Sequence, residues 1–298
     1  WEYNIFSEYG GGGGITIVYS NYIIVSNLIV RDNDGDVGAG IFVHSTEELL
    51  LENLLIKDNT GMSSCSGIDL YGNYNGMPLN QVPILQNLVI DHNVSMEVGG
   101  GLCVHVDAIL NDITISNNQA DDAVGMYLGG APILSDIRVV NNSQIEYYGE
   151  PNYWSSAVLV QGNAIMNNVL ISGNSVVGLT YYPAEINLNN VTIADNLGAG
   201  LLFVSEIVSG SSMINSIVWN NSEAITVAEG ISLDSLSIRF SDIQGGWIGE
   251  GNINENPEFI SDYELANDSP CINSGDDSVW SFDIDGSRTD MGFTGGSF

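Results

Sequence analysis

Copies of one short pattern, each ending in asparagine, recur along the chain and constrain its fold more than any other feature. Each copy reads Asn or Asp, an apolar residue, any residue, a second apolar residue, two further residues and Asn. The clearest copies are residues 27–33, 53–59, 87–93 and 112–118; later copies end at Asn142, Asn174, Asn196 and Asn221, and a degenerate ninth covers residues 236–242. Successive terminal asparagines lie 22 to 34 residues apart.

Apolar residues alternate within each copy, and this period of two indicates β-strands. A Gly-rich link and a second apolar strand follow, at 40–43, 67–70, 101–104 and 125–128, and a third apolar segment such as 48–51 precedes many copies. Short strands repeated at this spacing without helices predict a solenoid of stacked β-coils around a continuous aliphatic core. The recurring asparagines are expected to stack as an amide ladder at a sharp turn, where asparagine tolerates the left-handed backbone region.

The charge of the chain excludes several classes of partner. Its 298 residues include 5 Lys and Arg against 37 Asp and Glu, a formal net charge of −32. A potential this negative repels phosphates, so we expect no binding to nucleic acid or to an anionic membrane. The hydrophobic content of 44% excludes intrinsic disorder. No apolar run reaches the ~18 residues needed to span a bilayer, so no transmembrane segment is predicted.

Two groups of motifs carry a resemblance to a known family. The Gly-Gly-Gly-Ile and Asn-x-x-Ile-x-x-Asn alternation runs through the repeats, and the tail contains the segments 241–247, 256–259, 269–276 and 283–292. In both respects the chain resembles the right-handed parallel β-helix (pectin-lyase-like) proteins of the secreted bacterial surface-protein type. The resemblance implies an all-β single-stranded β-solenoid of about nine to ten coils. We expect the coils over residues 1–244 and a C-terminal segment, 245–298, packed on the last coil.

The basic residues that enzymes of this fold use are scarce. Lyases need a Lys or Arg to neutralise a uronate and a base to remove its α-proton. The chain has only Arg31, Lys57, Arg138, Arg239 and Arg288. The hydrolase motifs Gly-His-Gly and Arg-x-Lys are absent from the sequence. We therefore predict no catalytic residues.

One patch of the second strands is the best binding candidate. Alignment of these strands directs Ile41, Ile68 and Leu102 inward, and it places His44, Tyr71 and His105 in one outward column. Asp69 and Asp107 flank that column. Such a patch would suit a sugar, a metal or a protein partner.

Two acidic turns are candidates for Ca²⁺, the one cofactor that the composition suggests. Asp32, Asp34 and Asp36 place carboxylates at alternate positions, as at the start of an EF-hand loop, although the later ligands of that motif are missing. Asp283, Asp285 and Asp290 form a second acidic loop in the tail. Hard oxygen ligands on turns suit Ca²⁺, which would also reduce self-repulsion.

An apolar column on the outer wall predicts an assembly face. The middle outward position of the repeat holds Ile29, Leu55 and Val89 in consecutive coils, and exposed apolar stripes often mark contacts with a partner. The alternative is that the chain's own longer loops, 60–66 or 74–84, cover the column. Residues 11–18 also read as a strand of an uncapped first coil, whose open edge can template another strand.

Three cysteines, Cys65, Cys103 and Cys271, allow at most one disulfide, whose pairing the sequence leaves open.

These features together favour a role in binding or assembly over a role in catalysis. The resemblance implies an extracellular or cell-surface location. We expect a non-catalytic structural or adhesive protein, self-assembling into filaments or a surface layer or binding a cell-surface neighbour. A carbohydrate-active enzyme (lyase or hydrolase) and a glycan-binding module are the alternatives. A clustered acid–base pair in a groove would favour the enzyme, and an exposed aromatic row the glycan-binding module.

Overall fold

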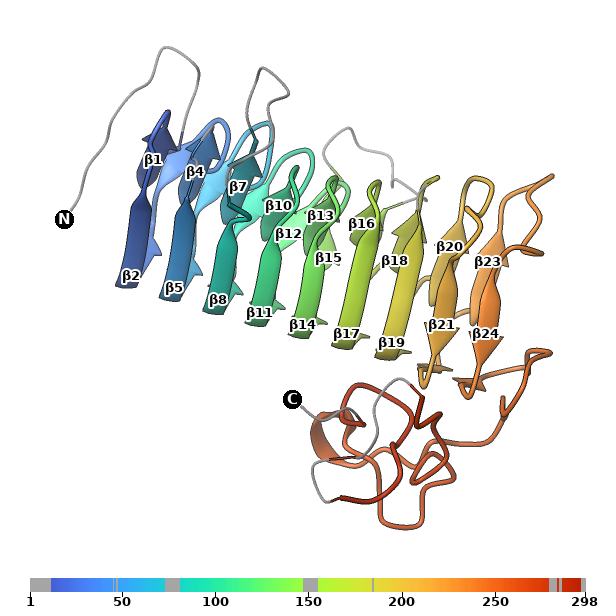
Figure 1. The fold of residues 1–298 in the computed structure, drawn as a ribbon. Coiled ribbons are helices and arrows are strands. Elements are labelled where there is room, and N and C mark those ends of the chain that lie inside the picture. The colour runs from blue at the N-terminus through green and yellow to red at the C-terminus, as the bar shows by residue number, and fades with distance from the viewer. Residues whose placement is uncertain are drawn as a thin grey trace.

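A computed structural model of the chain describes residues 12–44, 46, 48–72, 81–146, 155–183, 185–278, 283 and 286–295. Three parallel sheets wind around one core as a solenoid, and a C-terminal segment lies beside it (Figure 1). Each strand pairs in parallel with the equivalent strand one coil away, as Ile41 does with Ile68 and Leu102 with Met126. The only helix among the described residues is the short 3-10 helix η1 (Ser261–Tyr263).

The coils contribute strands to the three sheets in turn. Sheet A consists of β1 (Ile15–Val18), β4 (Ile41–His44), β7 (Ile68–Tyr71), β10 (Leu102–Val104), β13 (Met126–Leu128), β16 (Ser156–Val160), β18 (Val177–Tyr181), β20 (Leu201–Phe203) and β23 (Ile225–Val227). Sheet B consists of β2 (Ile23–Arg31), β5 (Leu49–Lys57), β8 (Ile84–Asp91), β11 (Ile109–Ser116), β14 (Ile133–Val140), β17 (Ala164–Ser172), β19 (Ile186–Ala194), β21 (Ser212–Ile214), β22 (Ile217–Trp219), β24 (Ser237–Arg239) and β25 (Asp242–Ile243). Sheet C consists of β3 (Asp34–Gly35), β6 (Thr60–Gly61), β9 (Val94–Ser95), β12 (Gln119–Ala120) and β15 (Ser143–Gln144).

The predicted fold class is confirmed, with a small correction to its length. Sheet A has nine strands, which make about eight complete turns and not the nine to ten coils expected. The difference arises at the degenerate ninth repeat. It forms only β24 and β25 of sheet B, and the described chain then leaves the solenoid for the C-terminal segment. The inward positions are closed to solvent as predicted, with Ile41, Ile68 and Leu102 each 0% exposed.

The asparagine ladder forms along the boundary between sheets B and C. The side-chain Nδ2 of each terminal asparagine donates to Oδ1 of the next, beginning with Asn33 to Asn59 at 2.8 Å and ending with Asn196 to Asn221 at 2.9 Å. The backbone N–H of each asparagine donates to the same oxygen, for example from Asn93 to Asn118 at 2.9 Å. Each rung therefore satisfies buried backbone and side-chain groups together, which is the condition for burying an amide in an apolar core.

The left-handed backbone falls on different residues from those expected. The ladder asparagines have ordinary φ, whereas the residue before many of them is left-handed, as at Asp32 (φ 57°) and Asn117 (φ 54°). The first residue of the repeat is left-handed too, as at Asn27 (φ 56°) and Asp112 (φ 51°). In β2 this residue lies inside one continuous strand and shifts the in–out alternation by one position. The third apolar segment of each repeat is consequently the first half of the sheet B strand.

Candidate functional site

The predicted binding residues gather on the outer face of sheet A. The registers β4–β7 and β7–β10 set Phe42, Asp69 and Cys103 in one outward column. His44 pairs with Tyr71 in the next outward column, and His105 follows Val104, the partner of Leu70, so it continues that column. Sequence alignment of the second strands thus placed these side chains correctly, because strand registers in a solenoid repeat from coil to coil.

Aromatic rings form a row along this face. Tyr71 stacks on His105 with ring centroids 4.0 Å apart, and His44 stacks on the other side of Tyr71 at 6.3 Å. Tyr19 extends the row at one end and Tyr127 at the other, at 5.7 and 4.9 Å from the nearest histidine. Because the central rings stack on one another, they cover each other's faces and direct mainly their edges outward.

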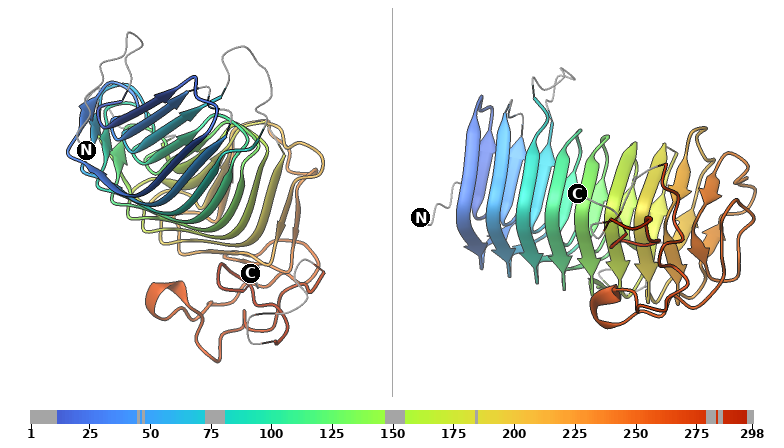
Figure 2. Two further views of the ribbon diagram at one scale, coloured as in Figure 1. Left: turned by 60° about the vertical axis from the view of Figure 1, so that its left-hand side comes forward. Right: turned by 60° about the horizontal axis from the view of Figure 1, so that its bottom comes forward.

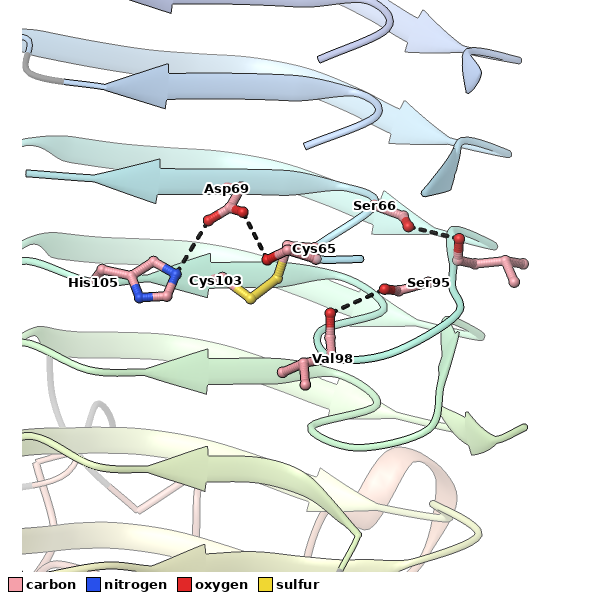
Figure 3. The surroundings of a disulfide bond; sticks show 9 residues. Cys65, Ser66, Asp69, Ser95, Val98, Cys103 and His105 are labelled. Atoms are coloured by element: carbon pink, nitrogen blue, oxygen red, sulfur yellow. Dashed lines mark hydrogen bonds and ion pairs between the residues drawn. A yellow bond between two sulfur atoms is a disulfide. The ribbon is translucent and has the colours of Figure 1, made fainter. Parts of the chain in front are cut away.

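Asp69 and His105 lie at ion-pair distance from each other beside the disulfide (Figure 3). Asp69 Oδ1 lies 3.2 Å from His105 Nε2, and Asp69 is fully buried whereas the His105 side chain is 25% exposed. Ser64 donates its hydroxyl to the second carboxylate oxygen of Asp69, Oδ2, at 2.8 Å. Burial, and then the negative charge of Asp69, raise the pKa of the Tyr71 phenol, which therefore stays neutral beside the pair.

The structure resolves the cysteine pairing that the sequence left open. Cys65, in the loop before β7, is bonded to Cys103 of β10, with Cα atoms 5.7 Å apart. Cys271 is free and buried. The disulfide joins two neighbouring coils directly beside Asp69. The fifth binding candidate, Asp107, lies apart: it is exposed, and its Oδ1 accepts the Ala131 N–H at 2.9 Å.

The calcium candidates lie at two separate turns. Asp32 pairs with Arg31 at 3.5 Å, Asp34 begins β3, and Asp36 accepts a hydrogen bond from the Ser63 hydroxyl. In the tail, Asp283 Oδ2 accepts the Asp290 N–H at 3.1 Å and Asp290 Oδ1 accepts the Asn273 N–H at 2.5 Å, while Asp285 lies outside the described residues.

Only one cluster among the described residues has the geometry to hold a metal ion. In Asp69, Cys103 and His105, one ligand atom of each side chain lies within 4.8 Å of the others. Neither group of calcium candidates forms such a cluster in this part of the chain. The sequence signal for the cluster was available, since Cys103 and His105 alternate on one strand and Asp69 is the neighbour of Cys103 one coil away.

The outer face of sheet B carries a long apolar column that the sequence analysis missed. It runs through Ile24, Leu50, Ile84, Ile109, Ile133 and Ile165, one residue from each of six successive strands. Ile24, Ile109, Ile133 and Ile165 are 37 to 48% exposed. A polar column that includes Glu52, Asn111 and Ser135 separates it from the predicted column of Ile29, Leu55 and Val89.

The predicted column is exposed at one end of the rod and covered at the other. Ile29 is 65% and Val89 41% exposed, and Leu55 is half-buried. The same column continues through Arg138, Leu170 and Thr192, and there Leu170 is only 1% exposed. Figure 2 shows the C-terminal segment lying across these later strands.

The C-terminal segment holds to sheet B through polar and ring contacts. The Phe293 N–H donates to Thr192 Oγ1 at 3.0 Å, and the Arg138 guanidinium lies 4.9 Å from the centre of the Phe293 ring. The segment also contacts the last coil, where Ile243 N–H donates to the carbonyl of Ile253 at 3.1 Å. The chain's own cover is therefore this segment. Residues 60–66 lie beside β7 and the disulfide, and residues 73–80 lie outside the described residues.

The first six strands of sheet B are nearly neutral in a strongly acidic protein. Strands β2, β5, β8, β11, β14 and β17 hold three cations and four acids, a net charge of −1, and the rest of the chain carries the remaining −31. The cations are Arg31, Lys57 and Arg138, and the acids are Glu52, Asp91, Asp112 and Asp136. Three of the five cations of the chain thus lie on these six strands.

Comparison with known proteins agrees with this architecture. A family model described as the right handed beta helix region matches residues 2–144. The chain is a right-handed parallel β-helix repeat protein. No curated protein and no solved structure matches this β-helix protein significantly. None of the residues that the structure describes forms a helix that could span a bilayer.

The β-helix supplies two chemically different surfaces. Sheet A offers stacked rings, one Asp–His pair and a disulfide. Sheet B offers two aliphatic columns on strands whose net charge is close to zero. Glycoside hydrolysis commonly uses two carboxylates placed across one bond. The Asp69–His105 pair contributes one carboxylate, already bound to Ser64 and paired with the imidazole, so it does not match that arrangement.

Proposed function

We propose that this β-helix protein is a non-catalytic extracellular structural or adhesive protein that acts by contact with other copies of itself. The observation that carries the proposal is the pair of aliphatic columns on the nearly neutral face of sheet B. One of these columns contains the exposed residues Ile24, Ile109, Ile133 and Ile165. The column is regular because the parallel register places equivalent residues of successive strands side by side.

The physical chemistry of that face favours a second copy as the occupant. Two chains of charge −32 repel over most of their surfaces, and the sheet B face is where that repulsion is weakest. Burying aliphatic surface contributes roughly 25 cal/mol per Å². The C-terminal segment already covers the later part of the same sheet, so the face is suited to contact with polypeptide of this composition.

Salt should control the association. The Debye length is about 30 Å at 0.01 M ionic strength and about 3 Å at 1 M. Long-range repulsion between acidic rods therefore dominates at low salt, and short-range apolar contact dominates at high salt. Divalent cations such as Ca²⁺ would act in the same direction by neutralising carboxylates.

The symmetry of the contact decides the form of the assembly. Two sheet B faces that meet about a two-fold axis make a closed pair. Growth into a filament or a surface layer then needs a second contact. An extracellular location is supported by the Cys65–Cys103 bond, because disulfides persist mainly in oxidising compartments.

A glycan-binding module is the second candidate, and the aromatic row of sheet A favours it. Tyr19 is 68% exposed and offers a free ring face, while the Tyr127 hydroxyl is bonded to Gln161 at 2.9 Å. The stacking of Tyr71 on His105 covers the ring faces that a sugar would use, so this candidate ranks below self-association.

The test compares one charge placed on and off the sheet B face. Ile133→Asp and Val89→Asp each introduce a carboxylate into one aliphatic column, and Leu197→Asp introduces the same charge at an apolar position, 75% exposed, outside sheet B. Sedimentation velocity and negative-stain electron microscopy would follow assembly from 0.01 to 1 M salt, with and without Ca²⁺.

We expect the native chain and Leu197→Asp to associate as the concentration of salt or Ca²⁺ rises. The two sheet B variants should remain monomeric at salt or Ca²⁺ concentrations several-fold higher than those at which the native chain associates. A native chain that is monomeric at every salt concentration and depolymerises a glycan would refute the proposal in favour of an enzyme. Binding of a neutral glycan that is lost in Tyr19→Ala would favour the second candidate.

A further inference from the structure

We propose that Asp69, Cys103 and His105 form a zinc site that becomes available when the Cys65–Cys103 disulfide is reduced. The site lies on the outer face of sheet A and is independent of the assembly face on sheet B. Carboxylate, thiolate and imidazole are the three side-chain groups that zinc prefers in proteins. A site with three protein ligands leaves the fourth position of the tetrahedron to a water molecule.

The distances match a tetrahedral coordination shell. Zinc binds His nitrogen and carboxylate oxygen at about 2.0–2.2 Å, so two such ligands of one tetrahedral ion lie about 3.3–3.5 Å apart. Asp69 Oδ1 and His105 Nε2 are 3.2 Å apart, and one ligand atom from each of the three side chains lies within 4.8 Å of the others. Small side-chain rotations would close the shell around one ion.

Two buried polar atoms point into the site without a hydrogen bond. Neither Asp69 Oδ1 nor His105 Nε2 has a hydrogen-bond partner in the described part of the chain, although they face each other at ion-pair distance. Asp69 is 0% exposed, and buried polar atoms without a hydrogen bond are rare in folded proteins. A metal ion between the two atoms would satisfy both.

Neighbouring groups orient the ligands in the way that metal sites require. The Ser64 hydroxyl occupies Asp69 Oδ2 at 2.8 Å, which leaves Oδ1 directed toward His105, as Figure 3 shows. Tyr71 stacks on the His105 ring at 4.0 Å and fixes its plane. Such outer contacts position the ligating atoms before the metal arrives.

The sulfur ligand is what makes the site depend on redox state. In the disulfide, Cys103 Sγ is bonded to Cys65 Sγ and has no thiolate to offer. A dithiol reductant transfers two electrons and two protons to the S–S bond, gives two thiols, and itself closes to a cyclic disulfide. Zinc then displaces the Cys103 proton and binds the thiolate.

The backbone at Gly99 leaves room for this exchange. Gly99 has φ +73°, and a Cβ atom there would collide with the sulfurs of both Cys65 and Cys103. Its absence lets the two sulfurs lie under the loop. After reduction, Cys65 remains on the loop before β7 whereas Cys103 stays fixed in β10, which keeps the ligand set on the rigid wall of the solenoid.

The test uses two variants that lose the same disulfide but differ in the sulfur that remains. Cys65→Ser leaves the Cys103 thiol beside Asp69 and His105, and Cys103→Ser leaves the Cys65 thiol there instead; the buried Cys271 is present in both. Four samples are compared: the two variants, the oxidised native chain and the native chain reduced with a dithiol. Reductant is removed from each of them under nitrogen. Zn²⁺ is titrated against a chromophoric chelator in excess Ca²⁺, which occupies non-specific carboxylate sites. Co²⁺ then reports thiolate ligation by its charge-transfer absorption.

We expect the Cys65→Ser chain and the reduced native chain to bind one Zn²⁺ with a thiolate–cobalt band, and the oxidised native chain to bind none. Cys103→Ser, and Cys65→Ser combined with His105→Asn, should bind at least about 10-fold more weakly, as loss of metal-site groups typically does. Equal affinity of the Cys65→Ser and Cys103→Ser chains, or a cobalt spectrum without the thiolate band, would overturn the proposal. If Cys65→Ser fails to fold by circular dichroism, the reduced native chain decides alone.

Discussion

Replacing Asp242 with asparagine should stabilise the protein at neutral pH and remove one step from its pH dependence. Asp242 begins β25 and is 0% exposed. Burial raises the pKa of its carboxyl group from the usual 3.8 to about 6, against the lowering effect of hydrogen bonds from the Glu255 N–H and the Cys271 thiol. The folded state therefore favours the neutral carboxylic acid.

The sign and size of the effect follow from this shift. Because the folded-state pKa is raised, the contribution to stability is fully present below about pH 4 and is lost as pH rises through about 6. A difference of about 2 pKa units at 1.36 kcal/mol each corresponds to about 3 kcal/mol at pH 7, as an upper estimate. Asparagine keeps an oxygen acceptor for the Glu255 N–H, 3.2 Å away, and carries no charge.

Urea unfolding at closely spaced pH values from 3 to 8 would measure the effect. The free energy of unfolding of Asp242→Asn, relative to the native chain, should rise by about 1–3 kcal/mol between pH 4 and pH 7. Asp262→Asn, at an exposed position, is the control for the general loss of one negative charge. A difference between Asp242→Asn and the native chain that stays constant over this range, or that equals the control, would refute the reasoning.

Three further perturbations test the fold and its ions. Asn118→Ala should lower the free energy of unfolding by about 2–4 kcal/mol in urea, because the buried N–H and Nδ2 donors of Asn93 lose their acceptor. Asn221→Ala, at the half-buried end of the ladder, should cost less. Equal losses in the two variants would contradict the ladder argument. Ile90→Asp buries an unpaired charge and should cost more than about 3 kcal/mol, seen as loss of strand signal in circular dichroism together with proteolysis of neighbouring coils; native-like protection would count against the core assignment. Ca²⁺ should raise the melting temperature at low ionic strength by binding the native state, and an unchanged melting temperature after chelation would remove Ca²⁺ from the account.

Features that repeat were predictable from the sequence, because a solenoid reuses one local geometry in every coil. The alternation in residues 53–59 is sufficient to direct Ile56 inward, where it is 0% exposed, and Leu55 outward. The equal spacing of second strands brought His44, Tyr71 and His105 together, and the stacked rings bear this out. The Asn ladder was foreseen for the same reason.

The Ile24 column was missed for an identifiable local reason. A left-handed residue, Asn27 in β2, shifts the alternation within a continuous strand, so the apolar residues before it read as a separate segment. Applying the period of two separately on each side of that asparagine would have found Ile24 and its equivalents. The signal was therefore in the sequence, but its interpretation needed the backbone conformation.

Other features were decided only by the tertiary structure, because they join segments that no repeat relates. Cys65 belongs to a loop, and its pairing with Cys103 depends on how that loop lies over sheet A. The contact of Phe293 with Thr192, 101 residues away along the chain, likewise follows from the path of a segment without regular strands. By itself the sequence determined the coil, its core and its ladder, since these are set by neighbours one repeat away. Which parts of the outer wall are covered, cross-linked or left open depends on single long-range contacts, and only the folded chain fixes those.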